Sequence, residues 1–412
     1  MTRNYEAMWQ TWDEIRLSVR NRKAYLYGRS EDWVHKAIEK LPNQLIGIVD
    51  RESGYHGQIY KGLAVMPLES IESIQECYFV ITAGDFDGIV ENLMRHGLRP
   101  GEDFSCSPDF RDYRVLAQIK SYKVNILLSS SDYNDTTRAR GSKNGGGLFV
   151  LETPSGKIRR VATGSFRQFE RSGEYIYAVE YVEKALVKFD LNFNIVAKVT
   201  LGKPNFCGLA INNEDKLLYL ANAGSDEICT FNLETLTEVG RRRFHTNGLG
   251  SEHHVNDLCF DGGILYCTYF SYCGGFKRGI FDGGVSAVDV SNPESIPTQL
   301  IGNLWKPHTP KIIDGKLVVL DSMRGYLLSG SPRPIAKFPG FTRGMFKHQQ
   351  FWAIAQSEDM YITDRMSSTD EAIVLNSGVY IFDEQSRGSY FYPTPEIMNI
   401  HCLANYVAPK ND

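Results

Sequence analysis

The sequence lacks any long hydrophobic run. No stretch approaches the roughly 20 consecutive apolar residues that a membrane-spanning helix requires. Residues 1–21 carry charges throughout and contain no apolar core of the kind found in a signal peptide. We therefore expect a cytoplasmic protein that has no membrane partner.

An excess of charge of one sign is also missing. The 412 residues contain 45 Lys and Arg against 49 Asp and Glu, which gives a formal net charge of −4. Such a balance provides no overall field for holding a nucleic acid or an acidic membrane surface. We therefore expect no nucleic-acid partner, whereas a small molecule remains compatible with this composition.

Closely spaced cysteine pairs are absent as well. The 8 cysteines stand at positions 77, 106, 207, 229, 259, 267, 273 and 402, without a Cys-X-X-Cys pair, and several lie in apolar, strand-like runs. Reduced cysteines behave as small hydrophobic residues, whereas a cysteine-based zinc site needs closer pairs. We expect these cysteines to be reduced residues of the core.

The composition changes near residue 112. Before that point, short apolar runs alternate with amphipathic segments of about a dozen residues, which is typical of a parallel sheet with crossover helices. Residues 1–112 are thus predicted to form a small Rossmann-like α/β domain. Apolar residues at three- and four-residue steps predict a further helix over residues 2–20, packed on the outside of this domain.

The evidence for a nucleotide in this domain is incomplete. Gly28 follows the first predicted strand, but the second and third glycines of the dinucleotide-binding fingerprint are missing. Asp50 ends the second strand, where a carboxylate could hold ribose hydroxyls, and Gly84 ends a later strand. Gly28, Asp50 and Gly84 are the candidate cofactor-binding residues, and a purely structural or docking domain is the alternative.

The order of these features resembles the amino-terminal, Rossmann-like domain of sugar O-acyltransferases and related sugar-nucleotide proteins. The resemblance covers strand, glycine turn, helix, strand ending in Asp, and a later strand ending in Gly. It implies that a nucleotide or sugar nucleotide is the ligand to test in this domain. It also suggests a role in surface-polysaccharide or secondary-metabolite biosynthesis.

Residues 113–412 show a repeated all-β pattern. Six apolar segments, each closed by a polar residue or Tyr, begin at residues 126, 176, 218, 265, 317 and 352. A period near 45 residues with several short strands per unit is typical of propeller blades. We therefore predict a six-bladed β-propeller. Residues 396–406 are predicted to form an inner strand that closes the ring against residues 124–130 and removes exposed sheet edges.

The hairpin geometry of a blade predicts where its polar side chains meet. In an antiparallel pair, the start of the inner strand and the end of the second strand lie at the same end of the sheet. Counting back from the polar closing residues Ser130, Glu180, Asn222, Tyr269, Asp321 and Gln356 gives the expected inner-strand starts. These starts are Arg167, Asn205, Asn256, His308, Arg343 and His401, with His254 as an equal candidate beside Asn256. We expect them to face a central channel.

The residue types at these positions favour an anionic ligand, because guanidinium groups pair bidentately with carboxylate or phosphate. We assign substrate binding to Arg167, Arg343, Asn205, Asn256, His401 and Gln356. The candidate catalytic residues are His308, His254, Asp321 and Glu180, with the two carboxylates as orienting groups. Two alternatives stay open. Arg167–Glu180 and His308–Asp321 could be purely structural pairs between strands, or His254, His308 and His401 could bind a divalent metal.

Five segments of this region, residues 252–270, 306–322, 339–357, 377–384 and 396–403, resemble an uncharacterised bacterial family of six-bladed propellers. The resemblance implies the propeller fold. It also implies importance for His308, Asp321, Ser322, Arg343 and residues 254–257. The chain departs from the usual pattern of that family at Thr309, Pro310, Lys311 and His401. The family has no established activity.

Three functions are compatible with these features. The first is an enzyme or binding protein for a small anionic metabolite, sugar- or nucleotide-linked, held in the propeller channel. The second is a metal-dependent hydrolase or lactonase, and the third is a scaffold that binds a partner protein. We favour the first, because a concentrated ring of polar residues is more than a scaffold needs. The oligomeric state is left open.

Overall fold

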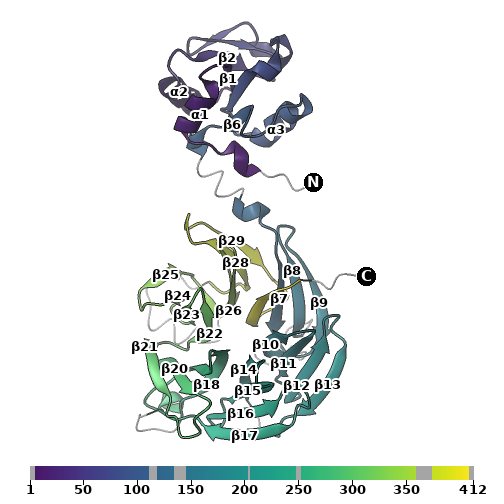
Figure 1. Cartoon of the computed structure of the whole chain (residues 1–412), viewed down its shortest axis with the longest axis vertical. Helices are drawn as coiled ribbons and strands as arrows, with labels where there is room; N and C mark the ends of the chain where they lie inside the picture. Colours follow the sequence, from purple (N-terminus) through teal and green to yellow (C-terminus); the bar gives the residue numbers. More distant parts are fainter. Residues whose placement is uncertain are drawn as a thin grey trace. The chain divides into compact units, whose positions relative to one another are not determined.

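The computed structural model describes residues 5–110, 118–133, 145–202, 205–246, 252–358 and 374–407. The chain divides into two compact units, Met1–Gln118 and Ile119–Asp412 (Figure 1). The predicted domain boundary at residue 112 falls within residues 111–117, which lie outside the described residues. Among the helices of the described residues, none combines the length and the apolar character needed to cross a membrane.

The amino-terminal unit contains a six-stranded sheet in the order β3-β4-β2-β1-β5-β6. Its strands are β1 (Lys23–Tyr27), β2 (Leu45–Val49), β3 (Ile59–Tyr60), β4 (Leu63–Met66), β5 (Cys77–Ile81) and β6 (Phe104–Cys106). Its helices are α1 (Trp12–Val19), α2 (Glu31–Lys40) and α3 (Phe86–Arg95), with short 3-10 turns at Tyr5–Met8, Ser53–Tyr55, Leu68–Ser70, Ile74–Glu76 and Pro108–Phe110. Only β3 pairs antiparallel, so the predicted parallel, Rossmann-like sheet is confirmed.

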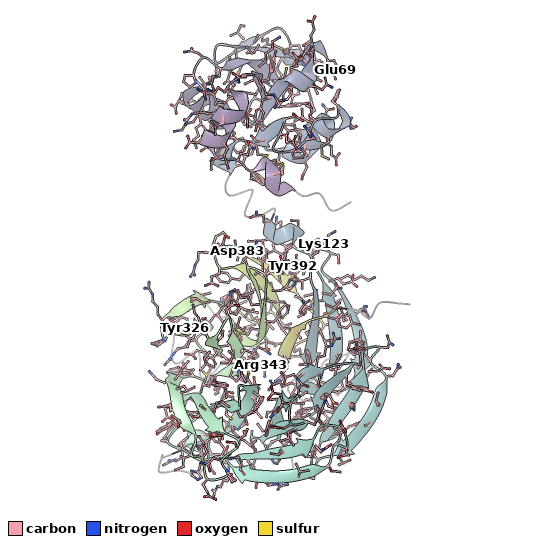
Figure 2. The ribbon with its side chains drawn as sticks, in the orientation of Figure 1. Glu69, Lys123, Tyr326, Arg343, Asp383 and Tyr392 are labelled. Atoms are coloured by element: carbon pink, nitrogen blue, oxygen red, sulfur yellow. The ribbon has the colours of Figure 1, made fainter. Side chains whose placement is uncertain are left out.

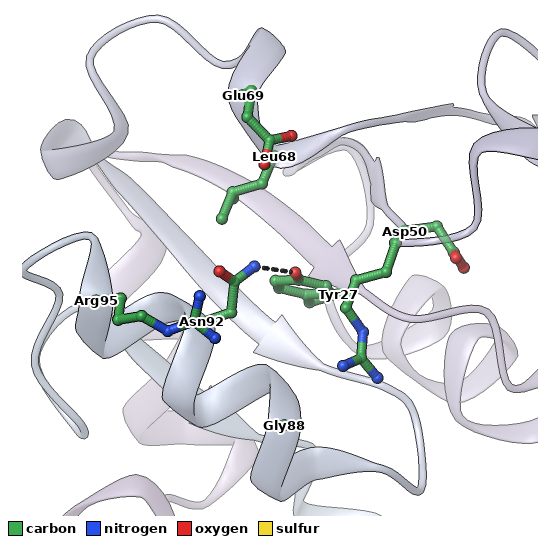
Figure 3. Close-up of a pocket in the computed structure, with 8 residues that line it drawn as sticks. Tyr27, Asp50, Leu68, Glu69, Gly88, Asn92 and Arg95 are labelled. Atoms are coloured by element: carbon green, nitrogen blue, oxygen red, sulfur yellow. Dashed lines mark hydrogen bonds between the residues drawn. The ribbon is translucent and has the colours of Figure 1, made fainter.

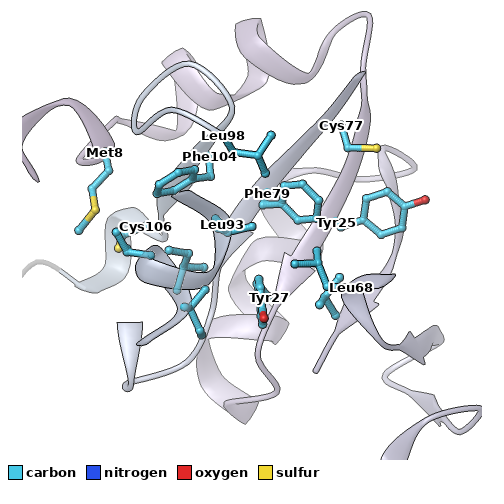
Figure 4. Packing of buried hydrophobic residues seen from close by; sticks show 14 of the residues in the cluster. Met8, Tyr25, Tyr27, Leu68, Cys77, Phe79, Leu93, Leu98, Phe104 and Cys106 are labelled. Atoms are coloured by element: carbon cyan, nitrogen blue, oxygen red, sulfur yellow. The ribbon is translucent and has the colours of Figure 1, made fainter. Parts of the chain in front are cut away.

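Both faces of this sheet are buried, because alternate residues of a strand point to opposite sides. Tyr25 and Tyr27 of β1 pack in one apolar cluster with Phe79 of β5 and Leu93 of α3 (Figure 4). Ala24 and Leu26, the alternating residues of the same strand, belong to a second cluster that includes residues of α1 and α2. The unit is therefore a three-layer sandwich of helix, sheet and helix.

The predicted helix over residues 2–20 is wrong in extent. The α-helix begins only at Trp12, because Thr11 and Glu14 form a capping box at its amino terminus. Met8 lies in the 3-10 turn before it and packs in the cluster on the α3 side of the sheet, whereas Ile15 and Val19 pack on the other side. The regular apolar spacing therefore spans two elements that serve opposite faces.

The second unit is a six-bladed β-propeller, as predicted, with six sheets of four antiparallel strands each (Figure 1). Blades 1 to 5 follow the chain as β10–β13, β14–β17, β18–β21, β22–β25 and β26–β29, and blade 6 has the order β30-β7-β8-β9. The innermost strands are β10 (Phe166–Ser172), β14 (Phe206–Asn212), β18 (Val255–Asp261), β22 (His308–Ile313), β26 (Phe341–His348) and β30 (Ile400–Asn405). The second strands are β7 (Asn125–Ser130), β11 (Tyr175–Glu180), β15 (Leu217–Asn222), β19 (Ile264–Tyr269), β23 (Lys316–Asp321) and β27 (Phe351–Ser357).

The two outer strands of each blade complete the sheets. The third strands are β8 (Gly147–Glu152), β12 (Ala185–Asp190), β16 (Glu227–Asn232), β20 (Gly283–Asp289), β24 (Tyr326–Ser329) and β28 (Gly378–Asp383). The outermost strands are β9 (Lys157–Thr163), β13 (Ile195–Thr200), β17 (Glu238–Arg243), β21 (Thr298–Leu304), β25 (Pro334–Lys337) and β29 (Ser389–Pro393).

The ring closes as the sequence predicts. The carboxy-terminal strand β30 pairs antiparallel with β7, from Ile400 opposite Ser130 to Asn405 opposite Ile126. Tyr406 extends this pairing through a hydrogen bond of 2.8 Å from its amide to the carbonyl oxygen of Asn125. Blade 6 is therefore built from both ends of the propeller sequence, and no strand edge is left open between blades 5 and 1 in the described residues.

Each innermost strand begins with an irregularity that the sequence period does not reveal. In blade 1, Phe166 pairs with Glu180 and Phe169 with Ala178, so Arg167 and Gln168 both lie opposite Val179. The same bulge recurs at 207–208, 256–257, 309–310 and 343–344, and a shorter irregularity holds His401 in blade 6. Bulges of this kind turn side chains out of the regular alternation. The residues at these six places are called the bulge positions below.

Candidate anion site at the centre of the propeller

The predicted site residues gather at the beginnings of the innermost strands. Arg167, Asn256, Arg343 and His401 occupy bulge positions, while His308 is the first residue of β22 and Asn205 directly precedes β14. The inner strands surround the middle of the propeller, and Arg343 lies near that centre (Figure 2). The hairpin argument therefore placed these residues on the correct strands and at the correct end of them.

Arg343 is buried, with only 2% of its surface exposed. Its Nη1 lies 3.0 Å from Nε2 of His401, and its Nη2 donates to Oγ of Ser357 at 3.0 Å and to Oδ1 of Asn399 at 3.2 Å. A guanidinium group only donates, so Nε2 of His401 must accept and the proton of that neutral imidazole is on Nδ1. The arginine thereby fixes the tautomer of the histidine beside it.

Asn399 is itself held by a buried carboxylate. Asp132 accepts hydrogen bonds from the side-chain amide of Asn399 at 3.0 Å and from the backbone amides of Met398 and Asn399 at 2.8 and 2.9 Å. The side-chain oxygen of Asn399 is consequently directed at Arg343. This chain of contacts leads from blade 6 to the guanidinium of blade 5 and restricts its orientation.

Arg167 is half-buried in blade 1, which is separated from the blade of Arg343 by blade 6. Its guanidinium carbon lies 3.8 Å from the ring centre of Tyr181, and its Nη1 contacts Sγ of Cys207. Tyr181 also donates to Oδ1 of Asn205 at 3.3 Å. Cys207 occupies the bulge position of blade 2, which we had not predicted, because its apolar surroundings in the sequence indicated a core residue.

His308 is held in one defined tautomer. Its Nδ1 lies 2.9 Å from the carbonyl oxygen of Lys306 and 2.8 Å from Oγ of Ser322. A carbonyl oxygen can only accept, so Nδ1 carries the proton and Nε2 carries the lone pair. Burial, followed by the positive charge of Arg343, lowers the pKa of His308 well below its usual value. The residue is therefore a neutral imidazole with an accepting Nε2.

Lys306 adds a third cationic side chain that the sequence argument missed. It is almost fully buried at 1% exposure, and its Nζ lies 4.2 Å from the ring centre of Phe281. The residue precedes β22, outside the counting scheme based on strand starts. The only signal in the sequence that could have indicated its place in the site is a positive charge two residues before His308.

His254 immediately precedes β18 and adopts a left-handed backbone with φ of 56°, like Asn205 with φ of 70° before β14. Its ring stacks on Phe270 at 4.6 Å and on Phe276 at 4.3 Å. Burial lowers the pKa of His254 to about 3, and the charges of Arg167 and Lys306 act in the same direction. Both His254 and Asn256 thus lie at the start of β18, and the histidine is neutral.

Three predicted polar residues have a structural role in this structure. Glu180 accepts from the backbone amide of Ser165 at 2.8 Å, and Asp321 accepts from that of Trp305 at 2.9 Å and from Arg324 at 3.0 Å. Gln356 donates to the carbonyl oxygen of Asn376 at 2.6 Å. The carboxylates of Glu180 and Asp321 thus bind the segments that lead into the inner strands. The structural pairs Arg167–Glu180 and His308–Asp321, considered above as an alternative, are not formed.

The three histidines are not gathered as a metal site. Within the described residues, no group of three His, Cys, Asp or Glu side chains is arranged to hold a metal ion. Nε2 of His401 already accepts from Arg343, and Nδ1 of His308 faces a carbonyl oxygen. The cationic side chains among them also disfavour a bound cation.

All eight cysteines lie in described residues and have free thiols. Six of them are buried, and Cys259 and Cys273 are half-buried, which agrees with their expected place in apolar strands. The surroundings of Cys207 differ from those of an apolar strand, because its thiol contacts the guanidinium of Arg167 at the centre of the propeller.

Asp257 is the acidic group of the bulge positions. Its Oδ2 accepts from the backbone amide of Thr309 at 2.8 Å, which links blades 3 and 4. Burial raises the pKa of Asp257 to about 6, although the nearby arginines oppose the shift. The protonated form is thus favoured by folding.

We predict that Asp257 makes stability fall with rising pH. A carboxyl group whose pKa is raised from 3.8 to about 6 stabilises the fold at low pH, and this stabilisation is lost as pH rises through about 6. Between pH 5 and pH 7.5 the wild type should lose about 1 kcal/mol more unfolding free energy than Asp257→Asn. Urea unfolding at both pH values measures the difference, and parallel pH profiles of the two proteins would contradict it.

Two of the three candidate cofactor residues of the amino-terminal unit, Gly28 and Asp50, line a pair of adjoining clefts. One cleft of about 290 Å³ is lined by Tyr27, Asp50, Arg51, Leu68, Glu69, Gly88, Asn92 and Arg95 (Figure 3). The other, of about 310 Å³, is lined by residues that include Gly28, Asp50 and Asp85. Both lie at the carboxyl ends of β1 and β2, where ligands of parallel sheets are usually found.

The three predicted cofactor-binding residues are not all accessible to a ligand in these clefts. Asp50 pairs with Arg29 at 2.6 Å, so its carboxylate already has a cationic partner. A side chain at Gly28 would lie 2.2 Å from Cβ of Ala83, which explains why glycine occupies this turn with φ of 101°. Gly84 is not among the lining residues of either cleft and lies beside Trp33.

Comparison with known proteins adds little to this geometry. No family model matches the chain, and no curated protein matches it. Among solved structures, the chain is similar to one in a "Crystal structure of Nidogen/Laminin Complex", with a TM-score of 0.49 and 9% identity over 70% of this chain and 99% of that chain. The resemblances to the uncharacterised propeller family and to sugar O-acyltransferases therefore stay predictions.

Proposed function

We propose that the propeller binds a small anionic metabolite at the face where its innermost strands begin, and that it acts on this metabolite. The observation that carries the proposal is the convergence of Arg167, Lys306 and Arg343 on this part of the propeller. Two of these cations are almost fully buried, and a buried cation favours an anionic ligand far more strongly than an exposed one. The neighbouring His254 and His308 are neutral, so they do not contribute to this positive charge.

The arrangement also supports proton transfer. His308 offers the lone pair of Nε2, and the carbonyl oxygen of Lys306 holds its Nδ1–H. This lone pair makes His308 a candidate general base, and a bound anion would oppose the charge of Arg343 that helps to lower its pKa. Arg343 and Arg167 would bind the carboxylate or phosphate of the substrate, and negative charge that develops near it would be stabilised by the same groups.

The other two functions have less support. A metal-dependent hydrolase would need a ligand set that is not gathered in the described residues. A scaffold for a partner protein would not require buried cations at the centre of the ring. A cytoplasmic location and a role in the biosynthesis of surface polysaccharides or secondary metabolites are part of the proposal and follow only from the sequence.

Arg167 provides the test of anion binding, because it is more accessible than Arg343. Calorimetric titration of carboxylates, phosphates and sugar phosphates into the purified protein should identify a ligand. Arg167→Ala should then weaken binding about 10- to 100-fold, the loss typical of a charged hydrogen bond, and Arg167→Lys should weaken it less. Arg241→Ala, which changes an arginine of the outermost strand β17 that pairs with Glu238, is the matched control. Equal affinity in all four proteins would refute the proposal.

A second candidate ligand site is the pair of clefts in the amino-terminal unit. Arg95 supplies positive charge, Arg51 pairs with Asp85, and the amide of Asn92, which donates to the phenol oxygen of Tyr27 at 2.7 Å, supplies a polar wall (Figure 3). These groups would suit a nucleotide or sugar nucleotide. Titration of uridine and adenosine diphosphate sugars into the full chain, with Arg95→Ala for comparison, tests this site separately. No binding, or binding unchanged by Arg95→Ala, would exclude it.

A further inference from the structure

A continuous series of rings in contact leads from blade 3 to Arg343, with two stacked contacts followed by two edge-to-face contacts. The rings, which we call the aromatic arc, are Phe276, His254, Phe270, His308 and Phe341. Successive ring centres are 4.3, 4.6, 5.3 and 5.6 Å apart, and the guanidinium carbon of Arg343 lies 5.2 Å from the ring of Phe341. His254 and His308 are thus each placed between two phenyl rings.

The outer part of the arc comes from an extended loop. The connection between β19 and β20 covers residues 270–282, whereas the equivalent connections cover only residues 181–184, 223–226 and 322–325 in blades 1, 2 and 4; those of blades 5 and 6 cover residues 358–377 and 131–146. These connections leave the ends of the second strands, at the face where the innermost strands begin. The longer loop of blade 3 is therefore an addition to the face that carries the cations.

This loop is firmly attached. Ser271 donates to a carboxylate oxygen of Asp282 at 2.8 Å, which joins the two ends of the loop. The backbone amide of Phe276 donates to the carbonyl oxygen of Glu252 at 3.1 Å, just before the innermost strand of the same blade. Its phenyl ring is consequently held against His254 by the backbone as well as by stacking.

The arc reaches solvent only at its outer end. Phe270, His308 and Phe341 are buried, whereas His254 and Phe276 are half-buried. The neighbouring Phe281 is also half-buried, lies 6.1 Å from Phe276 and is covered on one side by Lys306. An apolar surface that is partly open therefore adjoins the cationic groups.

We propose that the ligand of this site is an anion attached to a flat body with an apolar face, such as an aromatic ring or a pyranose ring. The body would lie against the outer end of the aromatic arc, and the anionic group would be directed at Arg167, Lys306 and Arg343. Aromatic side chains bind both kinds of face through stacking and burial of apolar area. This inference rests on the proposed function, because it assigns the substrate class of the same site.

The test compares phosphate monoesters that share a charge and differ in the body that carries it. Phenyl phosphate, glucose 6-phosphate, glycerol phosphate and inorganic phosphate are titrated into the wild-type chain by calorimetry. We expect phenyl phosphate or glucose 6-phosphate to bind at least about 10-fold more tightly than glycerol phosphate. The ester that shows this gain distinguishes an aromatic body from a sugar body.

The variant Phe276→Ala should remove the gain and leave the affinity for inorganic phosphate within about 2-fold of wild type, because the cations stay in place. Phe391→Ala is the matched control, since it truncates a half-buried phenylalanine on the outermost strand β29. Its binding series should equal that of the wild type.

The possible failures are distinguishable. Equal affinity of the wild type for all four phosphates, or a gain that survives in Phe276→Ala, would overturn the aromatic arc as a ligand surface and leave the anion site standing. Binding of none of the phosphates, nor of acetate and benzoate, would overturn the anion site itself. The wild-type series needs no variant, so the proposal stays testable even if Phe276→Ala does not fold.

Discussion

Arg343→Ala is expected to lower the free energy of unfolding by about 3 kcal/mol and to abolish anion binding. The change removes the donors that face Nε2 of His401, Oγ of Ser357 and Oδ1 of Asn399. Oγ of Ser357 still accepts from the amide of Ile400, whereas a buried acceptor left unpaired costs about 1–3 kcal/mol. Urea unfolding and calorimetric titration measure the two effects. An unchanged unfolding curve would show that the arginine is not held by these groups.

Arg343→Lys separates charge from shape at the same position. Lysine keeps the positive charge, but its single ammonium group lacks the planar fork that reaches His401 and Asn399 together. We expect intermediate stability and a loss of anion affinity of at least about 10-fold. Full retention of binding would mean that charge alone is recognised there.

Removal of residues 396–412 is expected to have the largest effect on folding. It deletes β30, whose residues Ile400, Cys402 and Leu403 are at most 3% exposed, and it leaves β7 and the inner face of blade 5 uncovered. An open sheet edge and exposed apolar surface favour aggregation. The truncated chain should be insoluble, or expanded and without a cooperative thermal transition, by light scattering and calorimetry.

Deletion of residues 408–412 is the control for this truncation, because it leaves β30 intact. That shorter chain should melt close to the parent temperature. A chain lacking residues 396–412 that also melts cooperatively near that temperature would contradict closure of the ring by β30.

The architecture was predictable because each blade repeats one signal. The apolar second strands end in polar residues, and counting back from Glu180 or Asp321 leads to Arg167 or His308 at the start of the strand before. The closing strand was recognisable for the same reason. The extent of the helix predicted over residues 2–20 was wrong, because apolar spacing does not reveal whether the residues pack on one side of the sheet or on both. Met8 and Ile15 pack on opposite sides.

The finer arrangement of the site was beyond a periodicity argument. A bulge adds one residue and turns the next side chain, so Cys207 and Asp257 enter the centre although their neighbours follow a strand pattern. Glu180 and Asp321 were expected beside Arg167 and His308, but the backbone amides of Ser165 and Trp305 compete for them. The position of Lys306 depends on the conformation of the segment before β22, and no spacing rule predicts that conformation.

The closure of blade 6 has a consequence for the order of synthesis. His401 and Asn399, which contact Arg343, belong to or precede β30, which is made after every other strand of the propeller, whereas its partner strand β7 is made first. A nascent or prematurely terminated chain therefore holds Arg343 without these two partners. If the propeller binds an anion as proposed, the complete site would form only after β30 has been made and has paired with β7.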